Sequence, residues 1–267
     1  MTTVAPAVQA IALPATSQLE YLISQTEPCL LRPLSFFVSW NGVITLAYSG
    51  FPPGLAALKA GINDSLTALP QEYSGSKWPK TSLGALHDRG RLTPDQLAAL
   101  NAICREESAK LSQQEDDQAI LVDQLNIVFY ECRSLERRLL QHSAPLRAAA
   151  PLDPRHPEPE EQARVRGVVA EADDPGYWFL ASKDGSRESH YRSPHLGVTL
   201  VHDLAPFRPG GAEPAAPAPA SPSGRPYGHA LPALVRAFRE RVDAALPGLY
   251  CWFADASLHS TVRSLMG

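Results

Sequence analysis

The sequence lacks several features that would assign it to a common class of protein. No run approaches the roughly 18 apolar residues of a membrane span. The four cysteines, Cys29, Cys104, Cys132 and Cys251, form no CxxC pair, and no histidine pair has zinc-helix spacing. Gly-rich phosphate loops, HExxH and GxSxG are missing too, which leaves triphosphatases, zinc proteases and α/β-hydrolases unsupported. We therefore expect reduced thiols, no metal and no cofactor.

Basic residues are also scarce where targeting signals need them. The first 18 residues contain no Lys or Arg, so they lack both a secretory n-region and the arginines of a mitochondrial presequence. Overall, 24 Lys and Arg oppose 28 Asp and Glu, for a formal net charge of −4. Bulk attraction to nucleic acid is therefore not expected, although a local basic cleft is compatible with this charge. We expect a cytoplasmic protein without a membrane partner, in an oligomeric state that the sequence leaves open.

Hydrophobic residues and proline are abundant by contrast. Of 267 residues, 44% are hydrophobic, which is enough for a sizeable core. The 25 prolines are about twice the usual share of roughly 5% and are clustered. The sequence predicts a flexible arm at 1–17 and a bilobal domain at 18–267. Within this domain, a Pro-rich linker at 143–162 separates a first half at about 34–142 from a second half at about 163–267. The second half carries a flexible insert at 205–228.

Hydrophobic periodicity gives a coarse map of the elements. The predicted helices are 18–26, a segment from Pro52-Pro53-Gly54 to Pro70, 94–111, 133–141 and 231–246. The predicted strands are a hairpin within 34–48, then 78–86, 119–131, 195–204, a hairpin in 165–184 that turns at 173–176, and a strand with an internal turn at 249–267. Together they predict an α+β fold.

Two parts of the chain follow the same order of elements. The first runs from GVITLAY through a Leu-rich helix ending in LP to a Trp and PKTSLGAL; the second runs from GVTLVHD through an amphipathic helix ending in LP to a Trp and LHSTVRSL. Gly42 to Lys80 spans 38 residues and Gly197 to His259 spans 62, and the difference of 24 equals the length of the insert 205–228. This agreement predicts a duplicated β-α-β unit with pseudo-two-fold symmetry.

The last strand of each unit carries polar side chains in an apolar context. Because residues i and i+2 of a strand point the same way, His259, Thr261 and Arg263 are expected on one face. The aligned face of the first unit carries Lys80 and Ser82, followed by a glycine. Pseudo-symmetry would turn these two faces toward each other across a cleft.

The segments WFADASLHSTVRSLMG and SKWPKTSLGAL resemble the two motif regions of the two-histidine (2H) phosphoesterase superfamily, which includes 2′-5′ RNA ligase-like proteins and cyclic phosphodiesterases. The resemblance covers roughly 34–111 and 195–267. It implies antiparallel sheets flanking a central cleft, helices outside, and one His-x-Thr/Ser motif per half. It also implies metal-independent cleavage of a cyclic or 2′-5′ phosphodiester, with His259 for proton transfer and Thr261 and Ser82 holding phosphate oxygens.

The first motif departs from the family because Lys80 stands where a histidine is expected. Histidine titrates near pH 6.5 and exchanges protons at neutral pH, whereas lysine starts near 10.4 and is a poor base unless its pKa falls. As a cation, Lys80 would still bind phosphate and stabilise negative charge. A slow or altered phosphodiesterase and a binding-only descendant therefore both remain open.

Four further side chains are candidates for substrate binding. Arg263 would lie near the rim and meet a phosphate, and Trp252, Tyr250 and Trp78 would stack on a base. Each candidate also has a competing role. The aromatic residues would pack in the core, and Arg263 would form a surface ion pair. His259 would be a core histidine, and Lys80 would be a solvated lysine.

The expected ligand is a nucleotide or an RNA end with a phosphodiester. The first hypothesis is an enzyme that cleaves it, and the second is an inactive module that binds RNA, a nucleotide or a protein. In a third interpretation the cleft is vestigial and the Pro-rich segments 143–162 and 205–228 tether a protein partner.

Overall fold

The computed structural model describes residues 17–266 except 74, 76, 112, 114, 148–149, 183–184 and 205–219. A helix at 17–25 opens the described chain. The other helices are α2 (Pro53–Ser65), α3 (Pro94–Leu111), α4 (Glu115–Gln118), α5 (Pro159–Ala170), α6 (Tyr177–Ala181), α7 (Glu188–Arg192) and α8 (Leu231–Ala245). The strands are β1 (Cys29–Leu31), β2 (Pro33–Val38), β3 (Ile44–Tyr48), β4 (Lys80–Leu86), β5 (Ile120–Val122), β6 (Gln124–Tyr130), β7 (Arg138–Pro145), β8 (Gly197–Asp203), β9 (Tyr250–Trp252) and β10 (His259–Met266).

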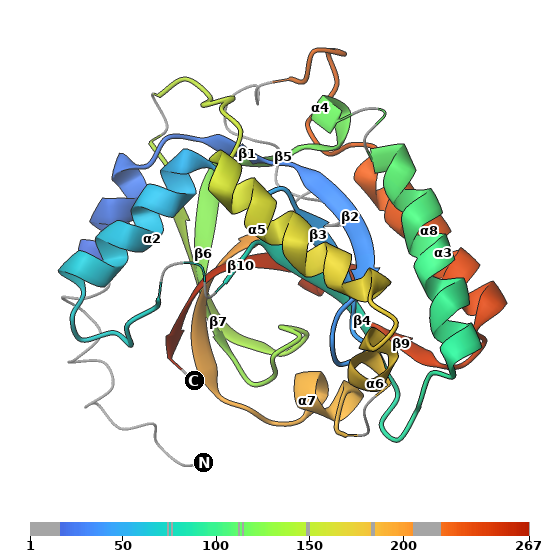
Figure 1. The fold of residues 1–267 in the computed structure, drawn as a ribbon. Coiled ribbons are helices and arrows are strands. Elements are labelled where there is room, and N and C mark those ends of the chain that lie inside the picture. Colours follow the sequence, from blue (N-terminus) through green and yellow to red (C-terminus); the bar gives the residue numbers. More distant parts are fainter. Residues whose placement is uncertain are drawn as a thin grey trace.

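Two four-stranded antiparallel sheets form the centre of the fold (Figure 1). The first sheet has the order β2-β3-β4-β9, and the second sheet has the order β10-β8-β6-β7. Strands β1 and β5 make a separate antiparallel pair. The predicted α+β class with antiparallel sheets is therefore confirmed. The predicted halves do not coincide with the sheets, because β6 and β7 join the second sheet and β9 joins the first.

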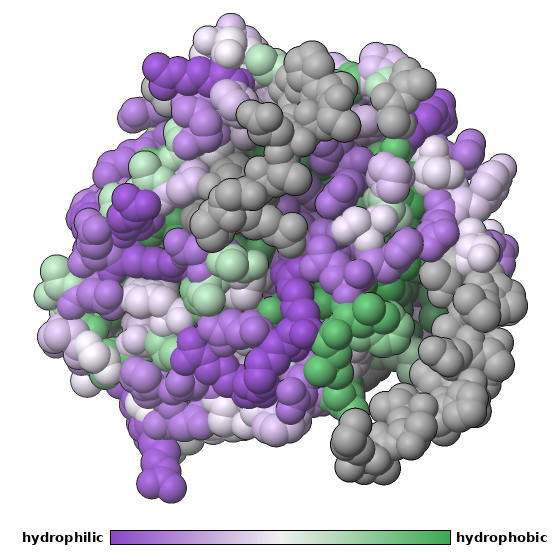
Figure 2. Space-filling view, turned by 180° about the vertical axis from the view of Figure 1, so that it is seen from behind, coloured by the Kyte–Doolittle hydropathy of each residue, from purple (hydrophilic) through white to green (hydrophobic). Residues whose placement is uncertain are grey.

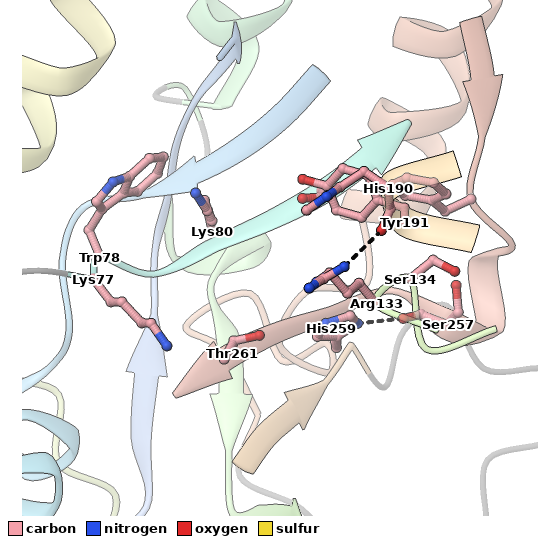
Figure 3. A pocket seen from close by; sticks show the side chains of 12 residues that line it. Lys77, Trp78, Lys80, Arg133, Ser134, His190, Tyr191, Ser257, His259 and Thr261 are labelled. Carbon is pink, nitrogen blue, oxygen red and sulfur yellow. Dashed lines mark hydrogen bonds between the residues drawn. The ribbon is translucent and has the colours of Figure 1, made fainter. Parts of the chain in front are cut away.

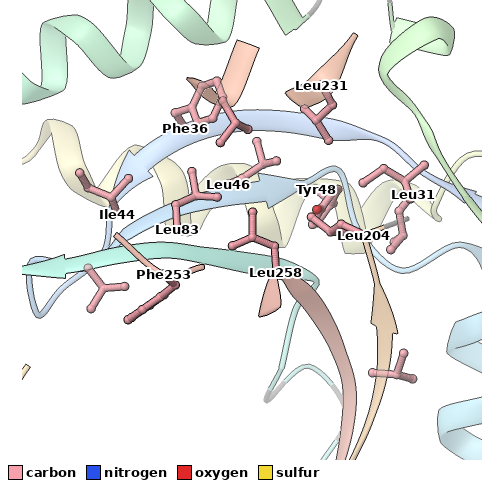
Figure 4. Packing of buried hydrophobic residues seen from close by; sticks show 14 of the residues in the cluster. Leu31, Phe36, Ile44, Leu46, Tyr48, Leu83, Leu204, Leu231, Phe253 and Leu258 are labelled. Atoms are coloured by element: carbon pink, nitrogen blue, oxygen red, sulfur yellow. The ribbon is translucent and has the colours of Figure 1, made fainter. Parts of the chain in front are cut away.

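Helices cover both faces of the first sheet because β2 carries apolar side chains on each side. Phe36 stacks on Phe238 of α8 with ring centroids 4.3 Å apart, whereas Phe37 packs in a cluster with Val165 of α5. Figure 1 shows α3 and α8 side by side, and α5 crossing the sheet. The main core also reaches the second sheet, since Leu83 of β4 and Leu258 before β10 belong to one buried cluster (Figure 4).

Strands β4 and β10 meet where the two sheets approach each other. The Thr81 hydroxyl on β4 donates a hydrogen bond of 3.0 Å to the carbonyl of His259 on β10. The same Thr81 oxygen lies 2.8 Å from the hydroxyl of buried Tyr48. Threonine at this inward position therefore links the two sheets, while its neighbours on β4 point the other way.

Both strands are interrupted at the same place in their ladders. On β4, Ser82 pairs with Thr45 and Gly84 pairs with the adjacent Ile44, so one residue of β4 bulges out. On β10, Thr261 pairs with Val201 and Arg263 pairs with the adjacent Leu200. Each bulge therefore comes directly after the third residue of its strand, which is Ser82 in β4 and Thr261 in β10.

Two sequence-based elements were wrong. The predicted helix 133–141 is a loop followed by β7, which pairs with β6 along its length. The predicted hairpin at 165–184 is helical, because α5 begins at Pro159 with Glu160 and Glu161 in its first turn and α6 follows. Proline and acidic residues are favourable at a helix N-terminus, although these residues lie within the predicted linker 143–162.

The Pro-rich segments are only partly irregular. The irregular part of 143–162 is shorter than predicted, since β7 continues to Pro145 and α5 begins at Pro159. Of the insert 205–228, residues 205–219 lie outside the described residues, as do 1–16 of the predicted arm. The remainder of the insert is anchored by a bridge between Ala220 and Pro226 and by the Ser221 hydroxyl, which donates to Asp117 at 2.7 Å.

The surface seen in Figure 2 is mainly hydrophilic, with hydrophobic side chains in smaller patches. Within the described ranges, no helix has both the length and the apolar character of a membrane span. All four cysteines are described, and each is a buried free thiol, as the sequence predicts.

Gly84 permits the close contact between β4 and β9, and this gives a stability prediction. An added Cβ would lie 2.7 Å from the Trp252 ring and 2.8 Å from the Cys251 carbonyl oxygen. We expect Gly84→Ala to lower the free energy of unfolding by about 1–3 kcal/mol, because overpacking forces the strands apart. Gly167, inside α5, has nothing within 4 Å of its added Cβ. Gly167→Ala should instead stabilise by up to about 1 kcal/mol. Urea denaturation of both variants measures the difference, and equal effects would contradict this packing.

Candidate functional site

Side chains from both polar strands line one cavity of about 400 Å³ (Figure 3). Lys80 and Ser82 come from β4, and His259 and Thr261 come from β10. The structure therefore brings together the four residues that the sequence nominated for catalysis. Trp78, one of the four candidates for substrate binding, also lines this cavity. A volume of this size lies within the range of roughly 300–1,000 Å³ that small-molecule sites occupy.

The ring of His259 is oriented by the turn that precedes β10. Its Nδ1 lies 2.7 Å from the carbonyl oxygen of Ser257 (Figure 3). A carbonyl oxygen only accepts hydrogen bonds, so Nδ1 carries the proton and Nε2 of the neutral ring is a proton acceptor. Burial lowers the pKa of His259, and the positive charge of Arg138 lowers it further, which outweighs the raising effects of the Ser257 carbonyl and Asp203. At pH 7 the ring is therefore mainly neutral and has the protonation state of a general base.

Lys80 faces the cavity as an ammonium group above an aromatic ring. Its Nζ lies 4.7 Å from the centroid of Trp78, a distance typical of a cation–π contact. Desolvation by the surrounding protein lowers the pKa of Lys80, and the charge of Lys77 lowers it further. No carboxylate within the described ranges forms an ion pair with Lys80. Its ammonium group is thus available to an anionic ligand and releases a proton more readily than an ordinary lysine.

The two hydroxyl side chains complete the set. Thr261 is half-buried on β10, and Ser82 is half-buried on β4. Burial raises the pKa of Tyr191 on α7, and a side-chain hydrogen bond with Ser82 partly offsets this effect. Ser82 lines the cavity, where its hydroxyl can donate to a ligand oxygen.

Arg263 is not at the rim of the cavity. Because β10 bulges between Thr261 and Arg263, the alternation of faces shifts, and the side chain of Arg263 enters the protein interior, where it is fully buried. Its guanidinium donates to Oδ1 of Asn63 at 2.5 Å and to the carbonyl of Pro70 at 2.7 Å. The expectation that Arg263 shares a face with the other two residues was wrong, and its contacts are those of a structural residue.

Tyr250 and Trp252 also lie outside the cavity. Both belong to β9, at the edge of the first sheet, and their rings stack with centroids 5.8 Å apart. Tyr250 is buried in the core. The indole Nε1 of Trp252 donates to Asp243 at 3.0 Å, and Arg239 lies over its ring. Core packing, the competing role, therefore describes these two residues.

The sequence interpretation missed the wall opposite the two strands. Arg133 and Ser134 come from the loop between β6 and β7, and His190 and Tyr191 come from α7. Phe253, Lys77 and Ser257 also line the cavity. Because the sequence predicts a helix at 133–141, it gives no indication that Arg133 lies at a site. No local motif marks α7, since only the tertiary fold brings it to the cavity.

Within the described ranges, no group of three or more His, Cys, Asp or Glu side chains is arranged to hold a metal ion. Comparison of the chain with protein-family models, with curated proteins and with solved structures found no match. The resemblance to the 2H phosphoesterases therefore remains a prediction that rests on the motif residues quoted above.

Proposed function

We propose that this protein is a 2H phosphoesterase-like enzyme that cleaves a cyclic or 2′-5′ phosphodiester of a nucleotide or RNA end without a metal. The observation that carries the proposal is the convergence of Lys80, Ser82, His259 and Thr261 on one cavity. Two hydroxyl donors, one cation and one neutral imidazole are what a phosphodiester and its hydrolysis require.

The chemistry follows from the protonation states of the two basic side chains. Neutral His259 accepts a proton from water at Nε2, and the water oxygen forms a bond to phosphorus. The bond from phosphorus to the ribose oxygen breaks, and the ammonium group of Lys80 donates the proton that the leaving oxygen needs. Ser82 and Thr261 donate hydrogen bonds to the non-bridging oxygens as their charge grows. Atoms and charge balance, since one proton is accepted and one is delivered.

The proposed duplication of a β-α-β unit would place Lys80 and His259 at equivalent positions. In each ladder the bulge comes directly after the hydroxyl residue, Ser82 in β4 and Thr261 in β10. Lys80 and His259 each lie two residues before that hydroxyl residue, in the regular part of the ladder. We infer that β3-α2-β4 and β8-α8-β10 are equivalent units. On this alignment, Lys80 corresponds to His259.

The proposed roles predict a bell-shaped pH dependence of kcat/KM. The acidic limb reports His259, which must be deprotonated, and should lie below pH 6.5 because its pKa is lowered. The basic limb reports Lys80, which must be protonated, and should lie below the ordinary value of 10.5. Initial rates of 2′,3′-cyclic nucleotide hydrolysis between pH 5 and 10 measure both limbs. Lys80→Arg should remove the basic limb, because arginine stays protonated there; a limb that persists in this variant would contradict the role of Lys80.

The direct test is incubation with 2′,3′-cyclic nucleotides and short 2′-5′-linked oligonucleotides in EDTA. Turnover that is retained in EDTA and is lost in Lys80→Met supports the proposal. Turnover that returns only on addition of a divalent cation would contradict it.

A second candidate is a module that binds such ligands without cleaving them. The observation that favours it is lysine in place of the second imidazole. Binding of a cyclic nucleotide that depends on Lys80, with no turnover between pH 5 and 10, would establish this function instead.

A further inference from the structure

The cavity has a second recognition region besides the four motif residues. It consists of Arg133 and Ser134 from the β6–β7 loop and His190 and Tyr191 from α7, and we call it the Arg133 wall. In Figure 3, Lys80 and Trp78 lie on the opposite side of the cavity from His190 and Tyr191, with Arg133 between His190 and His259.

The Arg133 wall is a built surface and not a loose loop. The backbone N–H of Ser134 donates to the carbonyl of Tyr191 at 3.0 Å, and the guanidinium of Arg133 donates to the carbonyl of His190 at 3.4 Å. A second link joins the same two segments, since Arg192 donates to both carboxylate oxygens of Glu136, at 2.8 and 3.0 Å. The loop and α7 are therefore fastened together, and they bring Arg133 to the cavity wall.

The positive charge of the cavity exceeds what one diester needs. Among the described residues, no Asp or Glu lines the cavity. Lys77 is compensated by Glu72, at 3.3 Å, whereas Lys80 and Arg133 have no carboxylate partner within the described ranges. A cyclic or 2′-5′ diester carries a single negative charge, which Lys80 matches. The guanidinium of Arg133 and the ring of His190 then remain for a second anionic group.

We propose that the substrate is a nucleotide that carries a second phosphate group, and that Arg133 binds this phosphate while the motif residues hold the scissile one. The inference rests on the proposed function. The half-buried aromatic side chains of Trp78 and Tyr191 also line the cavity and can contact the base of the same nucleotide. Two sources share this chemistry: a free nucleotide with a 5′-phosphate, and an RNA end whose preceding phosphodiester occupies the same place.

Stable product-like ligands test the proposal by calorimetric titration. Adenosine 2′-phosphate and adenosine 2′,5′-bisphosphate differ only in the second phosphate. We expect the full chain to bind the bisphosphate about 10–100-fold more tightly, which is the range for one charge-assisted contact. Arg133→Gln should remove this preference, and Arg133→Lys should keep part of it. Arg105→Gln, which removes an exposed charge on α3 outside the cavity, is the matched control and should change neither affinity.

A dinucleotide ending in a 2′-phosphate distinguishes the two sources. Tighter binding of the dinucleotide than of the bisphosphate indicates an RNA end, and the reverse indicates a free nucleotide. Equal affinity of the wild type for the two mononucleotides would overturn the proposal but leave the proposed function intact. An equal loss for both ligands in Arg133→Gln would place Arg133 at the scissile phosphate and would also overturn it. Failure of the wild type to bind any of the three would contradict the proposed function as well.

Discussion

His259→Ala is expected to lower kcat/KM for a 2′,3′-cyclic nucleotide by about 10²–10⁴-fold, the usual effect of losing a general base. The imidazole is the only neutral proton acceptor that the proposed step uses, and alanine replaces it with nothing that can accept a proton. The Nδ1 contact with Ser257 is a single hydrogen bond at a half-buried position. The fold should therefore persist, and binding of adenosine 2′-phosphate should change much less than turnover.

His142→Ala is the matched control for this variant. His142 lies on β7, is exposed, and pairs with Glu20 at 2.7 Å, outside the cavity. Its kcat/KM should stay within twofold of the wild type. Steady-state rates and thermal melts of both variants separate loss of chemistry from loss of folding. An active His259→Ala protein would remove His259 from the mechanism.

Arg263→Ala is expected to lower the free energy of unfolding by about 2–4 kcal/mol. The side chain is fully buried and donates to Asn63 and to the Pro70 carbonyl, so its removal opens a buried void and breaks both hydrogen bonds. Urea denaturation at pH 7 measures the change. Ligand affinity of the folded protein should be unaffected, because Arg263 does not line the cavity.

The control for this prediction is Arg105→Ala on α3. Its guanidinium is 65% exposed in an ion pair with Asp173, and such pairs contribute less than about 1 kcal/mol. A normal midpoint for Arg263→Ala together with a large loss of nucleotide affinity would show that the sequence-based role of Arg263 in substrate binding is right and that its buried contacts are unimportant.

Strong local signals made much of the fold predictable. Thr93 and Pro94 mark the start of α3, Asn41 and Gly42 mark the turn between β2 and β3, and the apolar spacing of α8 is that of a one-sided helix. The sheet that each of these strands joins was not predictable: β6 and β7 of the first half pair in the second sheet, and β9 of the second half pairs in the first sheet. Nothing in the composition of β7 or β9 indicates which sheet each one joins, because that choice is made by long-range packing.

The site divides in the same way. Lys80, Ser82, His259 and Thr261 were found because a period of two places each pair on one face of a strand. Arg263 was misplaced because a bulge leaves no mark in a sequence of alternating polar and apolar residues. The Arg133 wall was missed because its members are distant in the chain and meet only in the folded protein.

The central claim is that the four motif residues hold one phosphodiester between β4 and β10. A crystal structure of the protein with a slowly hydrolysed 2′,3′-cyclic phosphorothioate tests it most directly. We expect phosphorus between the Ser82 and Thr261 hydroxyls, Nζ of Lys80 in contact with a phosphate oxygen, and Nε2 of His259 directed at the phosphate group. A ligand bound elsewhere, or a phosphate that none of these four side chains contacts, would contradict the account.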